Sequence, residues 1–271
     1  MAVKSSRLPA SRPAKLVGSG VFESGPLVSV VLTTRDRPRF LPVALACYRH
    51  QTYQNRELIV VDDGDAHPLD AAQVAAAGGK LVRAAPGTPI GTKLNLGIEQ
   101  SRGPWCQKMD DDDWYAPDFL ASMVAGVMER RREICRPVVA HVAPFLFFDL
   151  ARWEIRQSIK LNVPGATLFF ARSDWEHRPF RPLMNDEDLW FQLDLYREGA
   201  RPQRIEAIES FIAVRHRMAR GERGHTWVDQ WDGRSLEQYL QERPLYRTPE
   251  ELLPEWALNT YRELRGQQAA A

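Results

Sequence analysis

The first half of the chain alternates short apolar runs with segments of helical periodicity. Residues 27–34 and 57–61 are apolar runs that end in polar or acidic residues, which is typical of buried strands in a parallel sheet. Residues 40–51 place apolar side chains at helical spacing, with Pro42 near the first turn, where proline is tolerated. A strand, a helix and a strand at this spacing predict a βαβ unit with a right-handed crossover. We therefore expect an α/β protein.

The remaining elements follow from the same two periodicities. Helices are predicted for residues 71–77, 92–100 and 119–132, for a segment from about Asn185 to Gly199, and for parts of the chain after Ser235. Strands are predicted for residues 80–83, 105–109, 137–142, 145–150, 152–156 and 166–171, and a connecting strand within 201–214. Residues 145–156 suggest a hairpin, so the second half has a more antiparallel character.

Four consecutive aspartates, 110–113, follow one of these strands and precede Trp114 and Tyr115. Adjacent carboxylates repel each other, by about 4 kcal/mol per pair at a separation of ~4 Å and an effective dielectric of ~20. A solvated acidic loop is one interpretation, because water screens such charges. In an extended segment, however, Asp110 and Asp112 project to the same side, at a sheet edge that commonly binds ligands. Two such oxygen donors suit a divalent cation bridging to phosphate, so we expect a metal–diphosphate site.

Polar and acidic residues also follow the first two strands. Because the carboxyl ends of parallel strands meet at one edge of a sheet, that edge should carry Thr33, Asp36, Asp62, Asp63 and the aspartate run. Residues 89–97 lead into the next helix and bring Lys93 to the same edge, where an ammonium group and a helix N-terminus favour an anion. A loop with Lys93 merely solvated is the alternative, and it stays open.

Composition limits which binding partners and which cellular compartment we expect for this protein. The chain has 271 residues, of which 44% are hydrophobic and 26% charged, enough for one full core with an appendage. A formal net charge of +1 gives no support for nucleic acid as a partner. Cys47, Cys106 and Cys135 lack metal-ligand spacing and indicate a reducing compartment, and no apolar run approaches the ~20 residues of a membrane span. We expect a cytoplasmic protein.

Four segments form an ordered set of motifs: 30–37 (VVLTTRDR), 60–64 (VVDDG), 90–97 (IGTKLNLG) and 110–117 (DDDDWYAP). Together they resemble the nucleotide-sugar half of the inverting family 2 glycosyltransferases. The resemblance covers about residues 27–120 and implies the GT-A fold, a Rossmann-like and mainly parallel sheet flanked by helices. Leu94 departs from the family, which frequently has arginine there, and this leaves Lys93 as the expected phosphate neighbour.

The resemblance also implies roles for these residues. The first strand end and the acid pair after the second strand would hold the nucleoside, and the aspartate run would contain the Asp-x-Asp motif, which contacts the ribose and, through Mn²⁺ or Mg²⁺, the diphosphate. The implied nucleotide-sugar residues are Thr33, Arg35, Asp36, Asp62, Asp63, Lys93, Asn95, Asp110 and Asp111, and the implied metal ligands are Asp112, Asp110 and a histidine. The register of the motif within Asp110–Asp113 stays open by one residue.

Acidic residues precede the helical segment that starts near Asn185. Taken alone, they predict a helix start with favourable N-terminal charge. The family carries a Glu-Asp pair at this point, so the resemblance implies that Asp188 is the catalytic base, with Glu187 beside it. Asp186 and Glu187 stay open as rival bases.

Residues 215–227 gather basic side chains and two histidines in an otherwise neutral chain. A solvated basic loop is one interpretation. Related enzymes often place a histidine and cationic residues here, closing over the diphosphate and giving a metal ligand. The resemblance therefore implies His216 as the metal ligand, with His225 as the second choice.

We expect three parts in the chain: a flexible N-terminal arm (1–25), a GT-A domain (26–227) and a helical C-terminal tail (228–271). Within the domain, the nucleotide-sugar half covers about 27–113 and the acceptor half about 114–227. The arm lacks the apolar core of a secretory signal. The tail has three roles open to it: packing on the body, a homodimer contact, or peripheral contact with a membrane.

These features predict a metal-dependent inverting glycosyltransferase. It would move a sugar from a nucleotide-diphosphate sugar to a hydroxyl of a glycan, a lipid-linked glycan or a small molecule. One alternative is a catalytically silent nucleotide-sugar binding module, which the intact Glu187–Asp188 pair disfavours. Another is a nucleotidyltransferase, which the missing Gly-rich phosphate loop near the N-terminus disfavours.

Overall fold

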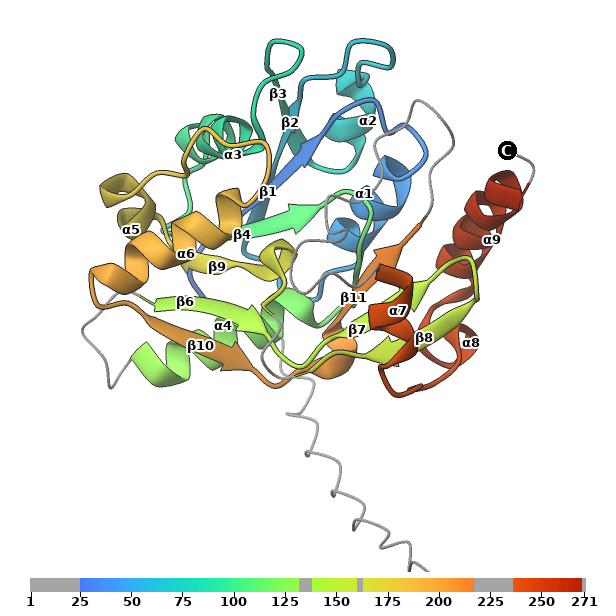
Figure 1. Ribbon diagram of the computed structural model, residues 1–271. Coiled ribbons are helices and arrows are strands. Elements are labelled where there is room, and N and C mark those ends of the chain that lie inside the picture. Colours follow the sequence, from blue (N-terminus) through green and yellow to red (C-terminus); the bar gives the residue numbers. More distant parts are fainter. Residues whose placement is uncertain (1–24, 132–137, 160–162, 217–235, 270–271) are drawn as a thin grey trace, which may run out of the picture.

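The computed structural model describes residues 25–131, 138–159, 163–216 and 236–269, which form two sheets with helices around them (Figure 1). The central sheet has the strand order β10-β6-β9-β4-β1-β2-β3, and the smaller sheet has the order β5-β11-β7-β8. The central strands are β1 (Val28–Thr34), β2 (Arg56–Asp62), β3 (Gly79–Arg83), β4 (Trp105–Asp110), β6 (Val138–Val142), β9 (Phe169–Ala171) and β10 (Arg201–Ile205). The strands of the smaller sheet are β5 (Trp114–Tyr115), β7 (Leu146–Asp149), β8 (Glu154–Gln157) and β11 (Phe211–Arg215).

Helices cover both faces of the central sheet, because alternate residues of its buried strands point to opposite sides. Val31 of β1 packs in one apolar cluster with residues of α3 and α6, whereas Val30 and Leu32 belong to another with α1 and α4. The helices are α1 (Leu41–Arg49), α2 (Ala71–Ala76), α3 (Ile90–Glu99), α4 (Phe119–Arg131), α5 (Arg172–His177), α6 (Glu187–Arg197), α7 (Leu236–Gln241), α8 (Pro249–Leu252) and α9 (Glu255–Ala269). This arrangement confirms the predicted α/β class.

The carboxyl ends of β1, β2 and β4 meet at one edge of the central sheet. These strands are parallel, and in their ladders Thr34 lies opposite Asp62 while Thr33 lies opposite Asp110. The predicted alignment of polar strand ends is therefore confirmed. Strand β9 runs antiparallel to both of its neighbours, β4 and β6, which gives the sheet its mixed character.

After residue 113 the structure differs from the prediction in several places. The single connecting strand expected within 201–214 is wrong: a 3₁₀ turn, η2 (Ile208–Ser210), redirects the chain, so that β10 and β11 lie in different sheets. Only the end of the strand predicted for 166–171 is extended, since Gly165–Thr167 form the 3₁₀ helix η1. Strand β5 has two residues, too few for a periodicity to reveal. The hairpin of β7 and β8 is confirmed.

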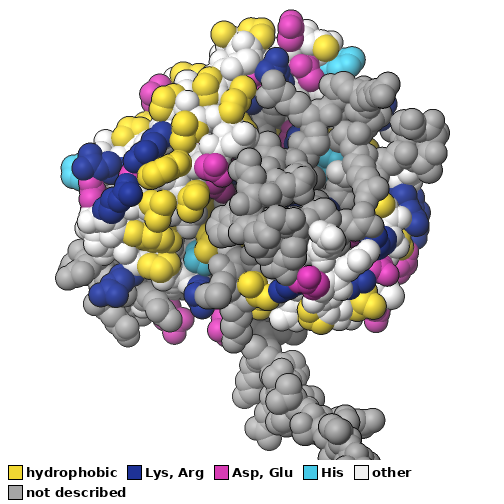
Figure 2. Space-filling model, in the orientation of Figure 1, with side chains coloured by type: hydrophobic (Ala, Val, Ile, Leu, Met, Phe, Trp, Pro, Cys, Tyr) yellow, Lys and Arg dark blue, Asp and Glu magenta, His cyan; other side chains and the backbone are white. Residues whose placement is uncertain are grey.

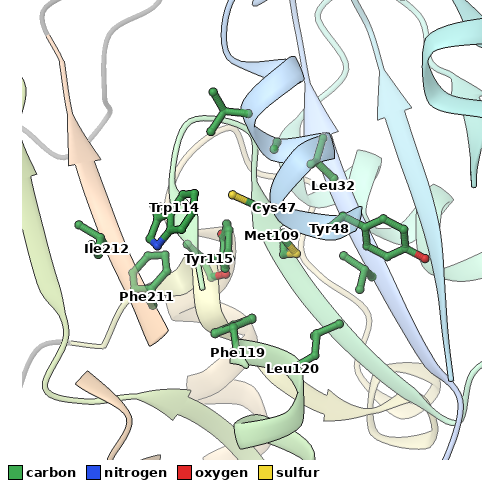
Figure 3. Close-up of a cluster of buried hydrophobic side chains, with 14 of the residues drawn as sticks. Leu32, Cys47, Tyr48, Met109, Trp114, Tyr115, Phe119, Leu120, Phe211 and Ile212 are labelled. Carbon is green, nitrogen blue, oxygen red and sulfur yellow. The ribbon is translucent and has the colours of Figure 1, made fainter. Parts of the chain in front are cut away.

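Aromatic side chains of β5, β11 and α4 pack in one apolar cluster with Leu32 and Met109 of the central sheet (Figure 3). The ring centroid of Tyr115 lies 5.2 Å from that of Phe211 and 5.0 Å from that of Phe119. Full burial of one such ring stabilises the fold by about 1.5–3 kcal/mol. The Tyr115 hydroxyl accepts a hydrogen bond of 2.7 Å from the backbone N–H of Asp110. The segment from β4 to β5 is thus held at both ends.

The helical tail packs on the body of the protein. Leu240, Leu258 and Tyr261 are buried, and the ring of Trp256 lies 5.3 Å from that of Trp114. Of the three roles left open by the sequence, packing on the body is confirmed. In the segments that the structure describes, no helix combines the length and apolar character needed to cross a membrane.

Hydrophobic side chains, with Lys and Arg beside them, gather on the α5–α6 side of the face shown in Figure 2. On α6, Leu189 is 36% exposed. The guanidinium carbons of Arg181 and Arg197 lie 4.1 and 5.6 Å from the ring centroid of Trp190. These arginines shield the ring from water, so the surface is less apolar than its colouring suggests.

One histidine in the central sheet is buried without a hydrogen bond. His141, on β6, is 1% exposed, and neither ring nitrogen has a partner among the described residues. Burial, together with the positive charge of Arg204 on the paired strand β10, lowers the pKa of His141 to about 4. The folded state therefore favours the neutral imidazole, and stability present above the ordinary pKa of about 6.5 is lost as the pH falls toward 4.

We expect His141→Leu to remove this pH dependence. Between pH 7.5 and 5 the wild type should lose about 2 kcal/mol of unfolding free energy relative to the variant, because unfolding lets His141 take up a proton. Urea denaturation at both pH values measures the difference. His67→Gln changes an exposed histidine and serves as the control. Parallel losses in wild type and His141→Leu would contradict the prediction.

Candidate functional site

Residues after β1 and β2 form one wall of the candidate site. Lys93, on α3, is 4% exposed. Its ammonium nitrogen lies 2.5 Å from Oδ1 of Asp63 and donates to the backbone oxygen of Thr34 at 3.2 Å. Nη1 of Arg35 lies 3.8 Å from Oδ2 of Asp63. The helix begins at Ile90, earlier than predicted, and Lys93 is buried and paired rather than solvated, while its implied role as a phosphate neighbour stays a prediction.

Two predicted acids at this edge hold backbone. Asp62 accepts hydrogen bonds of 2.8 Å from the N–H groups of Gly64 and Leu69, and it pairs with Arg83. Asp36 has a positive φ of 51° and accepts from the N–H groups at 65 and 67, at 3.0 and 2.7 Å. Both side chains thus shape the loop after β2.

Asn95 has a different set of contacts. Its amide nitrogen donates to the backbone oxygen of Phe180 at 2.8 Å, and its amide oxygen accepts from Phe180 N–H at 3.0 Å and from Trp175 Nε1 at 2.8 Å. The side chain therefore connects α3 to the segment around α5. The nucleotide-sugar role that the resemblance implies for Asn95 stays a prediction.

The aspartate run leaves the strand and bends. Strand β4 ends at Asp110, and Asp111–Asp113 form a bend, so the expectation of an extended run is wrong. As a result, neighbouring acids share one partner: Nη1 of Arg37 lies 2.9 Å from Oδ1 of Asp111 and 2.8 Å from Oδ2 of Asp112. The hydroxyl of Thr34 donates to Oδ2 of Asp111 at 2.6 Å.

Asp112 is also in contact with one of the two candidate histidines. Its Oδ2 lies 3.2 Å from Nε2 of His216, whose ring packs 4.3 Å from that of Phe40. The other candidate, His225, lies outside the described residues. Asp112 and His216 could offer an oxygen and a nitrogen ligand to a divalent cation. Among the described residues, however, no group of three or more His, Cys, Asp and Glu side chains is placed to hold a metal ion.

Asp113 belongs to the scaffold. Its Oδ1 accepts a hydrogen bond of 2.9 Å from the backbone N–H of Val214 and lies 3.6 Å from Nη1 of Arg215. Burial, reinforced by the charge of Asp112, raises the pKa of Asp113 well above its usual range. Asp113 therefore ties the aspartate run to β11, the strand that leads to His216.

A buried lysine connects the aspartate run to the start of α6. Lys108, on β4, is 5% exposed. Its ammonium nitrogen lies 2.7 Å from Oδ1 of Asp110 and 3.7 Å from Oε1 of Glu187. Although burial alone would lower the pKa of Lys108, the charges of Asp110 and Glu187 raise it above its ordinary value. Lys108 therefore stays protonated and holds the two carboxylates near each other.

Glu187 and Asp188 form the first turn of α6. Glu187 is buried, and burial raises its pKa to about 7 even though Lys108 opposes the shift. Asp188 is half-buried, and its pKa is raised by burial first, then by the charges of Asp110 and Asp186. Asp186, by contrast, is exposed, with a positive φ of 61°. The raised pKa expected of a base is present, but its main cause is burial.

Two glycines give these acids their room. A Cβ atom on Gly165 would lie 1.5 Å from Oδ2 of Asp188, so the carboxylate would have to move to make room for it. A Cβ atom on Gly91 would lie 1.9 Å from the backbone oxygen of Arg181 and 3.3 Å from Cβ of Glu187. Glycine therefore allows close approach at both positions, to a side chain at Gly165 and to the backbone at Gly91.

Sequence reasoning assigned no role to Lys108, Arg37 or Gly165. A signal for Lys108 was present: it is a cation in a buried strand two residues before Asp110, so both side chains share a face. The signal for Arg37 was its place in the motif 30–37, which was recognised as a whole without a role for this residue. Nothing in the local sequence pointed to Gly165, because its partner is on α6, far along the chain.

The fold and the placement of these acids define a GT-A domain. A family model described as glycosyl transferase family 2 matches residues 29–181, which is more than half of the chain. The chain belongs to this family.

Proteins related in sequence match this chain over limited segments. A Bacillus subtilis protein that carries the name glycosyltransferase EpsH is 32% identical over 102 residues, 36% of this chain and 30% of that protein. An uncharacterized glycosyltransferase of Rickettsia felis is 29% identical over 101 residues, 36% of this chain and 17% of its own length. The matched segment thus spans less than a third of either relative.

Solved structures share the fold. S. aureus TarS 1-349 in complex with UDP-GlcNAc has a TM-score of 0.55 at 16% identity, over 71% of this chain and 59% of that chain. The mannosyltransferase PcManGT from Pyrobaculum calidifontis, in complex with GDP-Man and Mn²⁺, has a TM-score of 0.57 at 17% identity, over 92% of this chain and 76% of that chain. At these identities the likeness establishes the fold alone.

We expect Gly165→Ala to displace the Asp188 carboxylate. Any sugar transfer that depends on the Asp188 carboxylate should fall roughly 10²-fold, the effect of a misplacement of about 1 Å, with the affinity for donor nucleotide nearly unchanged. The matched control is Gly266→Ala, where a Cβ meets nothing within 4 Å. Steady-state kinetics and nucleotide titration of both variants measure the two quantities. Wild-type turnover in Gly165→Ala would contradict the inferred crowding.

Proposed function

We propose that this protein transfers a glycosyl group from a nucleotide-diphosphate sugar to a hydroxyl acceptor, with inversion at the anomeric carbon. The observation that carries the proposal is the pairing of Glu187 and Asp110 through Lys108, which places the start of α6 beside the aspartate run. Family membership supports the same reaction class. The two solved relatives were bound to UDP-GlcNAc and GDP-Man, which supports a nucleotide-sugar donor of this type.

The donor would lie along the carboxyl edge of the central sheet. We assign the nucleoside to Thr33, Asp36 and Asp63, and the ribose to Asp110 or Asp111, at the ends of β1, β2 and β4. The diphosphate would lie near Asp112 and His216, which could hold a divalent cation. Mn²⁺ or Mg²⁺ bound there would supply positive charge to the departing diphosphate.

Asp188 is the base in this proposal. The hydroxyl of the acceptor would give its proton to Asp188 as the acceptor oxygen attacks the anomeric carbon, and the bond to the diphosphate would break in the same displacement. A carboxylate partly withdrawn from water holds a proton more readily, which suits this role. Glu187, fixed near Lys108, would position the turn that carries Asp188.

The acceptor is proposed only as a hydroxyl compound: a glycan, a lipid-linked glycan or a small molecule. Peripheral membrane contact and a homodimer stay predictions.

We expect Asp188→Asn to lower the transfer rate by roughly 10²–10⁴-fold, the usual contribution of a positioned base. Donor affinity should stay nearly intact, because the substitution removes none of the groups assigned to the nucleotide. Asp186→Asn and Glu187→Gln test the two rival bases, of which Asp186 is exposed and Glu187 buried. Wild-type transfer by Asp188→Asn would reject the assignment. Donor binding without transfer by any protein, wild type included, would favour the binding module.

We expect Asp112→Asn to weaken the Mn²⁺-dependent binding of UDP or GDP by at least roughly tenfold, about 1.4 kcal/mol. The variant keeps the shape of the side chain and loses only its charge. Calorimetric titration with and without Mn²⁺ measures the effect, with Asp65→Asn, an exposed aspartate in the neighbouring loop, as control. Equal affinities in wild type and Asp112→Asn would reject Asp112 as a metal ligand.

A further inference from the structure

Arg37 already provides a cation to the aspartate run. It follows β1, and its side chain is 18% exposed, whereas those of Asp111 and Asp112 are 4% and 5% exposed. A single guanidinium nitrogen, Nη1, lies within 3 Å of one oxygen from each aspartate, at 2.9 and 2.8 Å. The charge of this guanidinium therefore falls between two carboxylates that would otherwise repel each other.

The same oxygen cannot serve both cations well. Mg²⁺, for example, binds its oxygen ligands at about 2.0–2.1 Å. Oδ2 of Asp112 already has Arg37 at 2.8 Å and His216 at 3.2 Å. A divalent ion at this oxygen would lie within a few ångströms of the guanidinium, and the low exposure of the site limits screening of their repulsion.

A diphosphate offers Arg37 another partner. Guanidinium groups bind phosphate oxygens in the same planar, charge-assisted manner as carboxylates. The proposed donor would bring its diphosphate to Asp112 and His216, within reach of the loop that carries Arg37. The exchange would leave the aspartates to the metal and the guanidinium to the phosphate.

We propose that Arg37 is an internal counter-ion that couples the binding of the divalent cation to the binding of the nucleoside diphosphate. It competes with the cation for Asp111 and Asp112 until a phosphate group takes over the guanidinium. The inference rests on the proposed function, because it assumes a diphosphate at this edge. It implies that each ligand strengthens the binding of the other.

Arg35 provides a matched control. It lies on the same loop, and its guanidinium is 3.7 Å from Asp36 and 3.8 Å from Asp63. Replacing Arg35 or Arg37 with glutamine removes the same charge from the same loop. Only the second change removes the group that lies against the aspartate run.

The test is titration of Mn²⁺ alone into the full chain, followed by electron paramagnetic resonance of the free ion. Arg37→Gln should bind Mn²⁺ at least about tenfold more tightly than the wild type, within the range usual for coupled sites. Arg35→Gln should stay close to the wild type. Equal affinities in Arg37→Gln and Arg35→Gln would overturn the proposal, and so would tight Mn²⁺ binding by the wild type without nucleotide.

Two further variants locate the effect. Adding Asp112→Asn to Arg37→Gln should abolish the gain in Mn²⁺ affinity; a gain that persists would overturn the proposal. If Arg37→Gln does not fold, Arg37→Met removes the charge and keeps an unbranched side chain, and it should also bind Mn²⁺ more tightly than the wild type. Unchanged Mn²⁺ affinity in Arg37→Met would then overturn the inference.

A last measurement separates this inference from the proposed function. UDP or GDP should raise the Mn²⁺ affinity of the wild type more than that of Arg37→Gln, and equal increases would overturn the coupling. Absence of sugar transfer with any donor would refute the enzyme while leaving the Mn²⁺ titrations interpretable.

Discussion

Four adjacent carboxylates must be stabilised in a largely buried position, and the rest of the site depends on how this is done. The aspartates obtain their partners from separate parts of the chain: Arg37 after β1, Lys108 within β4 and the backbone of Val214 on β11. Each contact fixes an element relative to the run. The charge that makes the run suitable for a ligand is therefore also what holds the surrounding strands in place.

The sequence predicted most of the nucleotide-sugar half because its signals are local. The apolar runs of β1 and β2 end in polar residues, and their parallel pairing follows from the βαβ pattern. The later strands were harder, since their partners are distant in sequence. Strand β9 lies antiparallel between β4 and β6, and β11 leaves the central sheet after a single 3₁₀ turn. Periodicity reports which face is buried, not which neighbour covers it.

The residues of the candidate site also divide into those that the local sequence predicts and those that depend on distant parts of the chain. Residue types and motif order led to Asp112 and His216, which the structure brings together, and to Glu187, which Lys108 links to Asp110. The bend at Asp111–Asp113 could not be predicted, because it depends on Arg37 and on Asp113 accepting from β11. Burial, a tertiary property, also outweighs neighbouring charge in setting the pKa of Asp188.

The packing of α9 bears on the order in which the protein is built. Tyr261 is fully buried, and burial is the main reason that the pKa of its hydroxyl is raised. Negative charge at Cys47, Asp113 and Asp112 raises this pKa further. The apolar support beneath the aspartate run thus includes a residue more than a hundred positions later in the chain. A nascent chain can form the strands of the central sheet early, but the run gains its final support only after α9 has left the ribosome.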